Sequence, residues 1–385
     1  MQDWSQKYRR IAPPSAAAAG PEVWLSPSVN DLWWDDFLRS SPYGQYQQSS
    51  LWAEFKAGEG WQHHRVVTTD SSGICGGFQI LWKKRGPLRI GYVSKGPVTR
   101  VKLPSLRASL TDLLKHSARE LGLSALISQL PDEALAESES NETDFGFLQS
   151  NPMKVIEATY LVDVREDMES VRKKMNRKLR QCVRKSREQG VVVRAGTEAD
   201  LPAFFNLMAN TCRRQNSAPN PATLESVRRL WQLFASSNSV EMSFANRHGV
   251  DIAGRMNLIF GDRVTQWKKG WDGSNNSWHP NELLADHALE WAHDRGYRVC
   301  DFSAISRTTA EHILGGGLVD SSVARSRDMF NLRLGGYPQL LPRARLYLPN
   351  PVLRWGFRQT YLRFDQRRKR QQLATTASSA SQATS

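Results

Sequence analysis

The order of the expected helices and strands occurs twice along this chain, and that repetition constrains the fold more than any single motif does. In each half, helical patterns precede a meander of short strands, and a helix and one further strand follow the meander. Strands are recognised from alternating β-branched and apolar residues, and helices from apolar residues that recur every three or four positions. We therefore expect an α/β protein with mixed sheets in two tandem domains.

The first cycle runs from the N-terminal region to about residue 150. Its expected helices are 32–38, 50–57 and 106–121, the last closed by Gly122. Its expected strands are 66–69, 76–81, 89–93 and 125–130. The polar stretch 131–150 has few apolar anchors, so a loop or a domain boundary is expected there.

The second cycle repeats this order without visible sequence identity to the first. Its expected strands are 159–164, 191–194, 240–245, 252–260, 263–269 and 297–302. Its expected helices are 201–212, 224–235 and one that Pro280 opens and Gly296 ends. The duplication therefore concerns element order alone.

One further helix of the second cycle combines an apolar stripe with a high charge. Apolar residues spaced four apart predict a single helix over 171–189, and they are Val171, Met175, Leu179 and Val183. Residues 172–187 hold nine Lys or Arg and no acid. Like charges three or four positions apart repel on a helix, so this face is expected to bind RNA phosphates. A solvated surface helix is the alternative.

The charge balance of the whole chain favours anionic partners. The chain has 52 Lys plus Arg against 38 Asp plus Glu, a formal net charge of +14, and a pI near 9.8. The segments 172–187 and 343–370 contribute +9 and +8, and the rest sums to about −3. RNA, lipid headgroups and phosphorylated substrates suit such basic segments.

Membrane-spanning segments and cysteine sites are not expected. No stretch is long and apolar enough to cross a bilayer, and the N-terminus lacks the apolar core of a signal peptide. The chain is therefore expected in the cytoplasm. The widely spaced cysteines, with no C-x-x-C pair, argue against disulfides and a cysteine zinc site. No metal and no resident cofactor is expected.

Both ends of the chain are expected to be disordered tails, 1–20 because of Pro13, Pro14 and an Ala run, and 371–385 because of its polar small residues. Before the second tail, 352–370 interleaves aromatic and apolar residues with Arg. That pattern fits a helix at the interface of an anionic membrane. It fits equally a terminal helix docked on its own domain.

Five phrases occur in order between Gln48 and Pro338. They are Gln48-Ser49-x-x-Trp52-Ala53-x-x-Lys56, Gly91-Tyr92-Val93-Ser94-Lys95-Gly96-Pro97, Lys178-Leu179-Arg180-x-x-Val183-Arg184-Lys185, Pro280-x-x-Leu283-Leu284, and Phe330-Asn331-x-x-Leu334-Gly335-Gly336-Tyr337-Pro338. In this order and spacing they resemble the Fem-type (FemAB-like) aminoacyltransferases and the BioF2-like acetyltransferase domain of the GNAT superfamily.

The resemblance implies two GNAT (acyl-CoA N-acyltransferase-like) domains packed side by side. The first would span 21–150 and be completed by about 335–370, and the second would span 151–334 with the basic helix 171–189. Family members transfer an amino acid from aminoacyl-tRNA to an amine, commonly on the stem peptide of a peptidoglycan precursor. The chain is thus expected to be a tRNA-dependent aminoacyltransferase of cell wall or exopolysaccharide biosynthesis. Its amine acceptor could be lipid-linked, which would place the chain at the inner face of the membrane.

Two other functions stay open. The same fold could use acyl-CoA or acyl-carrier protein to acylate a lipid-linked saccharide. GNAT acetyltransferases place an (Arg/Gln)-x-x-Gly-x-(Gly/Ala) turn at a helix start, where backbone N–H groups bind pyrophosphate. Neither half carries this turn, which favours a donor other than CoA. The third function is that of an RNA- or membrane-binding protein with a degenerate site.

On the acceptor side, the resemblance implies that Lys56, Tyr92 and Lys95 line the precursor-binding cleft of the first domain. A Lys ammonium recognises phosphate or carboxylate as a point charge. The alternatives are an exposed helix lysine for Lys56 and a core position for Tyr92.

The donor side would be built from the second meander, by Arg255, Trp267, Lys268, Lys269 and Trp271. Aminoacyl transfer passes through an oxyanion that needs a cation or oriented N–H groups. Lys268 and Lys269 alternate in facing, so one of them points inward. The two tryptophans could stack the terminal adenine of tRNA, or they could belong to the core.

Three more residues are expected at the reaction centre. Asp301 could orient or deprotonate the amine, or serve as a turn partner. The family phrase usually reads Phe-Lys where this chain has Phe330-Asn331. The resemblance implies that the lysine of the other family members lies at the reaction centre and binds the tRNA end. Arg333 is a candidate to replace its charge. The residues expected to bind RNA are Lys173, Lys174, Arg177, Lys178, Arg180, Arg184 and Lys185.

Hydrolase machinery is not evident in the sequence. It contains neither a recognisable Ser/His/Asp triad nor an H-E-x-x-H motif. An ester donor is already activated and an amine nucleophile only has to lose a proton, so the expected transfer requires neither.

Overall fold

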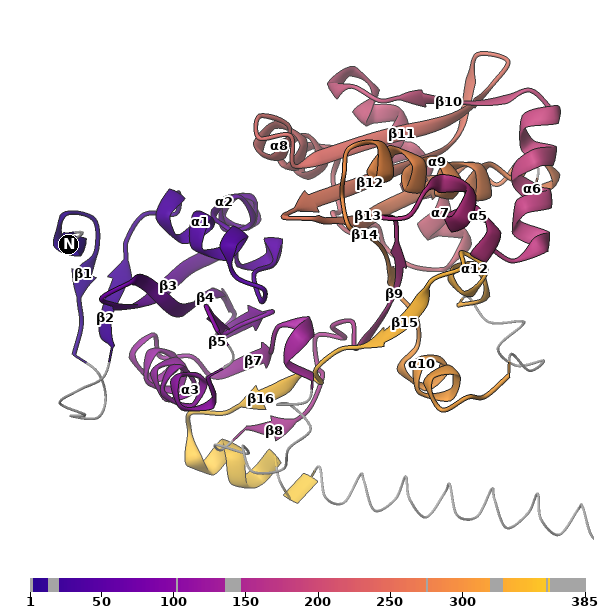
Figure 1. The fold of residues 1–385 in the computed structure, drawn as a ribbon. Helices are drawn as coiled ribbons and strands as arrows, with labels where there is room; N and C mark the ends of the chain where they lie inside the picture. Colours follow the sequence, from indigo (N-terminus) through magenta and orange to yellow (C-terminus); the bar gives the residue numbers. More distant parts are fainter. Residues whose placement is uncertain are drawn as a thin grey trace, which may run out of the picture.

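The computed structural model describes residues 3–12, 21–101, 103–135, 147–274, 276–318, 328–357 and 359–360. It has two lobes, each built on one mixed sheet (Figure 1). The sheet of the first lobe has the strand order β1-β2-β3-β4-β5-β7-β16-β8, with β6 beside β4, and that of the second has the order β10-β11-β12-β13-β14-β9-β15.

The first lobe follows the first cycle of the sequence. Its elements are η1 (Trp4–Gln6), β1 (Arg9–Arg10), β2 (Glu22–Ser26), α1 (Leu32–Ser40), η2 (Tyr46–Gln48), α2 (Ser50–Gly58), β3 (Gln62–Asp70), β4 (Gly73–Arg85), β5 (Leu88–Ser94), β6 (Val98–Thr99), α3 (Pro104–Glu120), β7 (Ala125–Gln129), η3 (Asp132–Ala134) and β8 (Leu148–Gln149).

The second lobe follows the second cycle. Its elements are β9 (Ala158–Asp163), α5 (Met168–Lys174), α6 (Arg177–Glu188), β10 (Val191–Ala195), η5 (Glu198–Asp200), α7 (Leu201–Arg214), α8 (Leu224–Ala235), β11 (Val240–Arg247), β12 (Val250–Phe260), β13 (Arg263–Trp271), η6 (Asn276–Trp278), α9 (Pro280–Asp294), β14 (Val299–Ala304), α10 (Arg307–Leu314), α12 (Met329–Leu332) and β15 (Tyr337–Leu340). The last strand, β16 (Arg345–Tyr347), returns to the first sheet.

The same crossover occurs in both lobes. In the first, β5 continues through α3 into β7, which pairs parallel to β5. In the second, β13 continues through α9 into β14, which pairs parallel to β13. Antiparallel strands β3, β4 and β11, β12 precede these units in the two sheets. The structure therefore confirms the repeated element order and the mixed sheets expected from the sequence.

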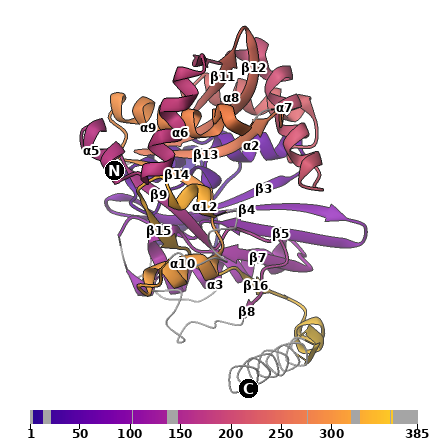
Figure 2. The same cartoon turned by 90° about the vertical axis from the view of Figure 1, so that its right-hand side faces the viewer.

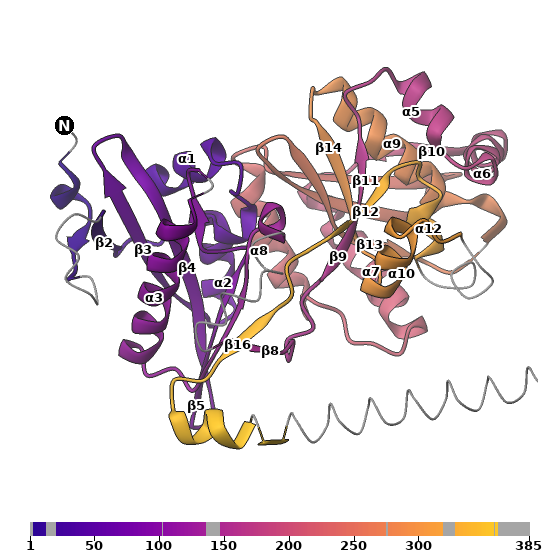
Figure 3. The same ribbon diagram turned by 60° about the horizontal axis from the view of Figure 1, so that its bottom comes forward.

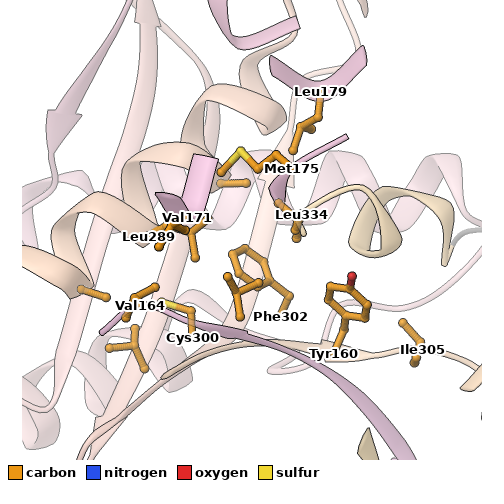
Figure 4. Packing of buried hydrophobic residues seen from close by; sticks show 14 of the residues in the cluster. Tyr160, Val164, Val171, Met175, Leu179, Leu289, Cys300, Phe302, Ile305 and Leu334 are labelled. Carbon is orange, nitrogen blue, oxygen red and sulfur yellow. The ribbon is translucent and has the colours of Figure 1, made fainter. Parts of the chain in front are cut away.

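Each crossover helix buries an apolar face against its own sheet. Leu106, Leu110 and Leu114 of α3 pack on the first sheet. In the second lobe, α9 and the start of the basic region pack on β9 and β14, where Leu289, Val171 and Met175 surround Phe302 (Figure 4).

A separate apolar cluster joins the two lobes. Trp52 and Phe55 of α2 pack against Phe204 of α7 and Leu230 of α8. Because one core is shared across the boundary, the lobes are held together by packing as well as by the exchanged strand β16.

Two segments differ from the sequence expectation. The helix expected over 171–189 is two helices, because Met175 and Asn176 leave the helical conformation (ψ 145° and 138°) and Asn176 caps α6 through its side chain. The N–H of Asn176 donates instead to the carbonyl of Arg333, at 2.9 Å. Residues 3–12, assigned to a disordered tail, form η1 and β1, and Tyr8 is buried.

The region after β16 is described only in part. Residues 351–357 are helical, and Figure 3 shows this helix at the lower edge of the first lobe. The rest of the expected interfacial helix, apart from 359–360, and the tails 13–20 and 371–385 lie outside the described residues. Among the described residues, no helix has the length and apolar composition needed to cross a bilayer.

Candidate active site

A cavity of about 740 Å³ lies between the two sheets. The first lobe lines it with the end of α1, the loop before η2, and Lys95 and Asp132 beyond the ends of β5 and β7. The second lobe lines it with the β12–β13 turn, Thr159 and Asp301. Both lobes thus contribute charged side chains to one cleft.

A chain of ion pairs crosses this cleft from lobe to lobe. The Lys95 ammonium lies 2.5 Å from Oδ1 of Asp132. Arg263 donates from Nη1 to Oδ2 of Asp132 at 2.8 Å and from Nη2 to Oδ2 of Asp301 at 2.6 Å. The other oxygen of Asp301 accepts from the Thr159 hydroxyl and, at 2.8 Å, from the N–H of Ser303. Both oxygens of Asp301 are therefore occupied.

Asp132 and Arg263, at the centre of the bridge, stay charged at neutral pH. Burial would raise the pKa of Asp132, but the charges of Lys95 and Arg263 outweigh it and hold the pKa at about 2. Burial also opposes the charge of Arg263, yet Asp301 and Asp132 raise its pKa above the usual value. The interlobe bridge is consequently ionic rather than neutral.

The backbone at both ends of the bridge is strained. Lys95 and Ser303 have positive φ values of 57° and 64°, a conformation that costs free energy outside glycine. Ser303 donates its hydroxyl to the carbonyl of Gln266 at 2.6 Å, which ties β14 to β13. Strain of this kind gathers at sites where side-chain placement matters more than stability.

A smaller pocket of about 340 Å³ adjoins the cavity, and Tyr46, Gln47, Lys95, Ile156 and Ser303 line both. Its lining includes Lys56, Lys95, Lys154 and Lys268 and contains no acidic residue. Trp52, Phe55 and Trp267 add aromatic surface. Lysines around an apolar floor suit an anionic ligand with an apolar part.

Two of the three residues expected on the acceptor side lie in this pocket. Lys56 is held by Glu59 at 2.5 Å, and Lys95 begins the ion-pair chain. Tyr92 lines neither cavity and packs edge-on against Trp61 with 5.0 Å between ring centres. Its position matches the core alternative.

The residues expected on the donor side separate onto two faces of the second sheet. Lys268 and Trp267 line the smaller pocket. Lys269 lies on the opposite face, with its Nζ 4.6 Å from the ring centre of Phe330, and Arg255 lies 4.8 Å from the ring centre of Phe302. The alternation of the two lysines is as expected from the sequence.

Asn331 lies beside this second group, and Trp271 and Arg333 do not. The Asn331 side chain is buried and its Nδ2 donates to the Phe302 carbonyl at 3.4 Å. Trp271 packs with Val183, away from Trp267, so the two tryptophans do not form one stacking site. The Arg333 carbonyl accepts a hydrogen bond from the N–H of Asn176, at the break between α5 and α6.

The basic helices carry both paired and unpaired cations. Arg172 and Arg187 both reach Asp286 of α9 at 2.8 Å, and Lys173, Lys174 and Arg184 pair with neighbouring glutamates. Figure 2 shows α6 running alongside α9. Four exposed side chains have no carboxylate within 4 Å in the described part of the chain, and they are Arg177, Lys178, Arg180 and Lys185.

A group of three side chains could hold a metal ion, although none was expected from the sequence. Ligand atoms of Cys182, His279 and Glu282 lie within 4.8 Å of one another, between α6 and the start of α9. Burial raises the pKa of the Cys182 thiol, while Arg333, Lys178 and Lys185 are close enough to oppose that shift. Such cations disfavour a divalent metal there.

Three central residues of the site were not singled out from the sequence. Asp132 falls in the polar stretch that was interpreted as a boundary, Arg263 follows a Gly-Asp turn, and Thr159 opens a strand. The repeated element order did carry a signal for Asp132. Strands β7 and β14 correspond in the two cycles, and Asp132 directly follows β7, whereas Asp301 lies within β14.

The fold is shared with solved tandem GNAT-like structures. Residues 171–311 match the family model of the acetyltransferase (GNAT) domain. The chain is similar to the crystal structure of FemX, with a TM-score of 0.71 and 16% identity over 83% of this chain and 96% of that one. It is also similar to a tandem GNAT protein from the clavulanic acid biosynthesis pathway, with a TM-score of 0.51 and 12% identity over 86% and 99%. The fold class is therefore the tandem GNAT fold.

Similarity in sequence narrows this class. The chain is 23% identical over 301 residues, 73% of its length and 86% of the other, to the UDP-N-acetylmuramoylpentapeptide-lysine N(6)-alanyltransferase of Weissella viridescens. It is 25% identical over 199 residues to the lipid II:glycine glycyltransferase of Staphylococcus saprophyticus, spanning about half the length of each (49% and 48%). The homologues of this chain are thus transferases of the Fem type, which confirms the resemblance seen in its motifs.

Proposed function

We propose that this protein moves an amino acid from aminoacyl-tRNA to an amine of a peptide or a cell-wall or saccharide precursor. The observation that carries the proposal is the charged cleft between two GNAT-like sheets, in a chain that is similar over most of its length to an alanyltransferase. These relatives favour the aminoacyltransferase function over the acyl-CoA alternative.

The acceptor is assigned to the interlobe cleft. The lysine-lined pocket with Lys56, Lys95 and Lys268 suits phosphate or carboxylate groups of a precursor. The adjoining cavity, with both acids and bases on its walls, suits a peptide. One acceptor spanning both would lie across the shared residues Tyr46 and Ser303.

The donor is assigned to the opposite face of the second sheet, and its ester would reach the acceptor between β13 and β14, which pair only as far as Thr265 and Asp301. Arg255, Lys269 and Asn331 gather there, and the exposed basic face of α6 lies beside α9 in the same lobe. Lysine and arginine side chains on a helix bind RNA phosphates with a strong dependence on salt. Lys173, Lys174 and Arg184 are part of this proposed RNA surface despite their glutamate partners.

The chemical step needs no covalent enzyme intermediate. The amine nitrogen forms a bond to the ester carbon, the carbonyl oxygen carries the developing negative charge, and the C–O bond to the ribose breaks. The amine loses a proton and the ribose oxygen gains one. Cations at the carbonyl oxygen lower the barrier, whereas Asp301, with both oxygens occupied, acts by holding Arg263 rather than by taking the proton.

A transfer assay tests the function. Purified protein is incubated with a mixed pool of charged tRNA and with muropeptide acceptors, both nucleotide-linked and lipid-linked, and the products are weighed by mass spectrometry. An acceptor heavier by one aminoacyl residue is the expected result, with deacylated tRNA as the control. Transfer from acyl-CoA or acyl-carrier protein alone would establish the alternative, and no transfer from any donor would refute both.

Peripheral contact with an anionic membrane is also proposed. In helix 351–357, Val352, Leu353 and Trp355 are 71%, 50% and 66% exposed, whereas Arg354 points inward and donates to the Leu348 carbonyl at 2.9 Å. An outward apolar face with Trp suits the headgroup region of a bilayer. Vesicles with phosphatidylglycerol should retain the wild type and release a Val352→Ser/Trp355→Ser variant, and equal retention of both would contradict the contact.

A further inference from the structure

Arg255 and Lys269 lie side by side on neighbouring strands of the second sheet. They are register partners in the antiparallel pair β12–β13, which places their Cα atoms about 5 Å apart. Arg255 is 2% exposed and Lys269 is half-buried. Two like charges that are removed from water and held next to each other destabilise a fold unless a counter-charge accompanies them.

No counter-charge contacts this pair. Within the described residues, neither side chain forms an ion pair or donates a hydrogen bond, and each cation instead faces an aromatic ring, Phe302 or Phe330. Glu241 and Glu282 act on the pair only at longer range. Burial, and then the charge of Arg255, lowers the pKa of Lys269 to about 8.

The groups around the pair are aromatic or neutral. Phe302 belongs to β14 and Phe330 to α12, and the neutral side chain of Asn331 lies against the Phe302 carbonyl at 3.4 Å. Position 331 directly follows Phe330 in the chain, and the Phe330 ring contacts the Lys269 ammonium. A cation carried by either position would enter the same small region.

We propose that Arg255 and Lys269 together bind the anionic oxygen of the acyl donor, and that Lys269 supplies from β13 the charge that position 331 does not carry. This assignment rests on the proposed aminoacyltransferase function. The anionic oxygen has two possible sources in the donor, the oxyanion that forms as the amine attacks the ester and a phosphate of the terminal nucleotide. Two cations without a protein counter-ion suit either source.

The first test compares Lys269→Met with the wild type. Losing one oriented cation at an oxyanion lowers the rate about 100-fold, while the melting temperature should stay equal or rise because an unpaired charge leaves the interior. A fall in kcat identifies the oxyanion as the ligand, and a rise in KM for charged tRNA identifies the phosphate. Lys84→Met, an exposed lysine on β4, is the matched control.

The second test moves the charge. Lys269→Met/Asn331→Lys should recover at least tenfold of the lost kcat/KM, whereas Lys269→Met alone should not. A Lys269→Met enzyme within twofold of the wild type, or a double variant with no recovery, would overturn the inference while an active wild type leaves the proposed function intact. A wild type that transfers nothing would refute the proposed function itself.

Discussion

Each sheet of this protein buries one arginine almost completely, and the two arginines are held in opposite ways. Arg65 of the first sheet is 0% exposed and is fully satisfied. It donates to Gln79 Oε1 at 2.6 Å, to the carbonyls of Ser28 and Val29 at 3.1 and 3.0 Å, and lies 3.6 Å from a carboxylate oxygen of Asp31. Among the described residues, Arg255 of the second sheet, 2% exposed, makes no hydrogen bond or ion pair and faces the Phe302 ring.

Under the proposed function, the difference separates a structural cation from one that binds the donor. A buried charge with a complete set of partners holds its neighbours in place and has nothing left to offer a ligand. A buried charge without partners costs stability and retains its full capacity to bind an anion. The two lobes share an element order, yet by this criterion only the second is prepared for a donor.

The largest effect on the free energy of unfolding is expected from replacing Arg65, the arginine with a complete set of partners. Arg65→Met leaves Asp31 buried beside no guanidinium, and removing one member of a buried ion pair costs about 3–5 kcal/mol. Chemical denaturation should show a loss of that size in the free energy of unfolding. A loss below about 1 kcal/mol would mean that Lys7, 3.3 Å from Asp31, carries the charge balance alone.

The matching substitution in the second sheet should have the reverse pattern. Arg255→Met should leave the free energy of unfolding unchanged or higher, because Arg255 forms no ion pair within 4 Å in the described part of the chain and Glu241 acts on it only at longer range. Aminoacyl transfer should fall about 100-fold, the cost of one oriented charge at a reacting oxygen. A variant that is destabilised but has a normal kcat/KM would show that Arg255 is structural. The two arginines would then not differ in role.

The interlobe bridge predicts a stability that depends on pH. Because the pKa of Asp132 is about 2 when folded and about 3.9 in an unfolded chain, its charge adds about 2.6 kcal/mol that is present above pH 4 and is lost as the pH falls toward 2. The stability gap between wild type and Asp132→Asn should therefore narrow over that window. A gap that stays constant from pH 5 to pH 2.5 would contradict the ionic bridge.

The smallest expected effect concerns the basic face that only the second lobe carries. Replacing Arg177, Arg180 and Lys185 by Gln should lower the slope of log K against log salt for tRNA binding by about 2, as phosphate contacts are lost. Filter binding at several salt concentrations measures the slope. Lys173 and Lys174 already pair with glutamates, so the variant Lys173→Gln/Lys174→Gln should change the slope less. An equal change in slope would show that this pairing does not affect tRNA binding.

The sequence predicted the order of elements well because local periodicity specifies helices and strands. It missed the break in the basic helix, since the apolar stripe continues through Met175, whereas the Asn176 N–H donates to the distant Arg333 carbonyl and its side chain caps α6. Contacts between residues far apart in the chain leave no local pattern.

The site was predicted in part for the same reason. Lys95 and Lys56 stand at strand or helix ends and Asp301 lies within a strand, all in segments that the sequence analysis could pick out, and the structure brings Lys95 and Asp301 into one bridge. Arg263 and Asp132, which complete that bridge, come from a turn and from a polar stretch 131 residues apart. Nothing near either residue in the sequence marks it as part of this bridge.

The return of β16 to the first sheet has a consequence for synthesis on the ribosome. Strand β7 pairs on one side with β5 and on the other only with β16, and β8 pairs with β16 alone. The hydrogen-bonding edge of β7 is therefore left open while about 200 further residues are translated, roughly 10–40 s at ordinary elongation rates. The first lobe is begun first and finished last, so a chain truncated before residue 345 would present an unpaired strand edge to its neighbours.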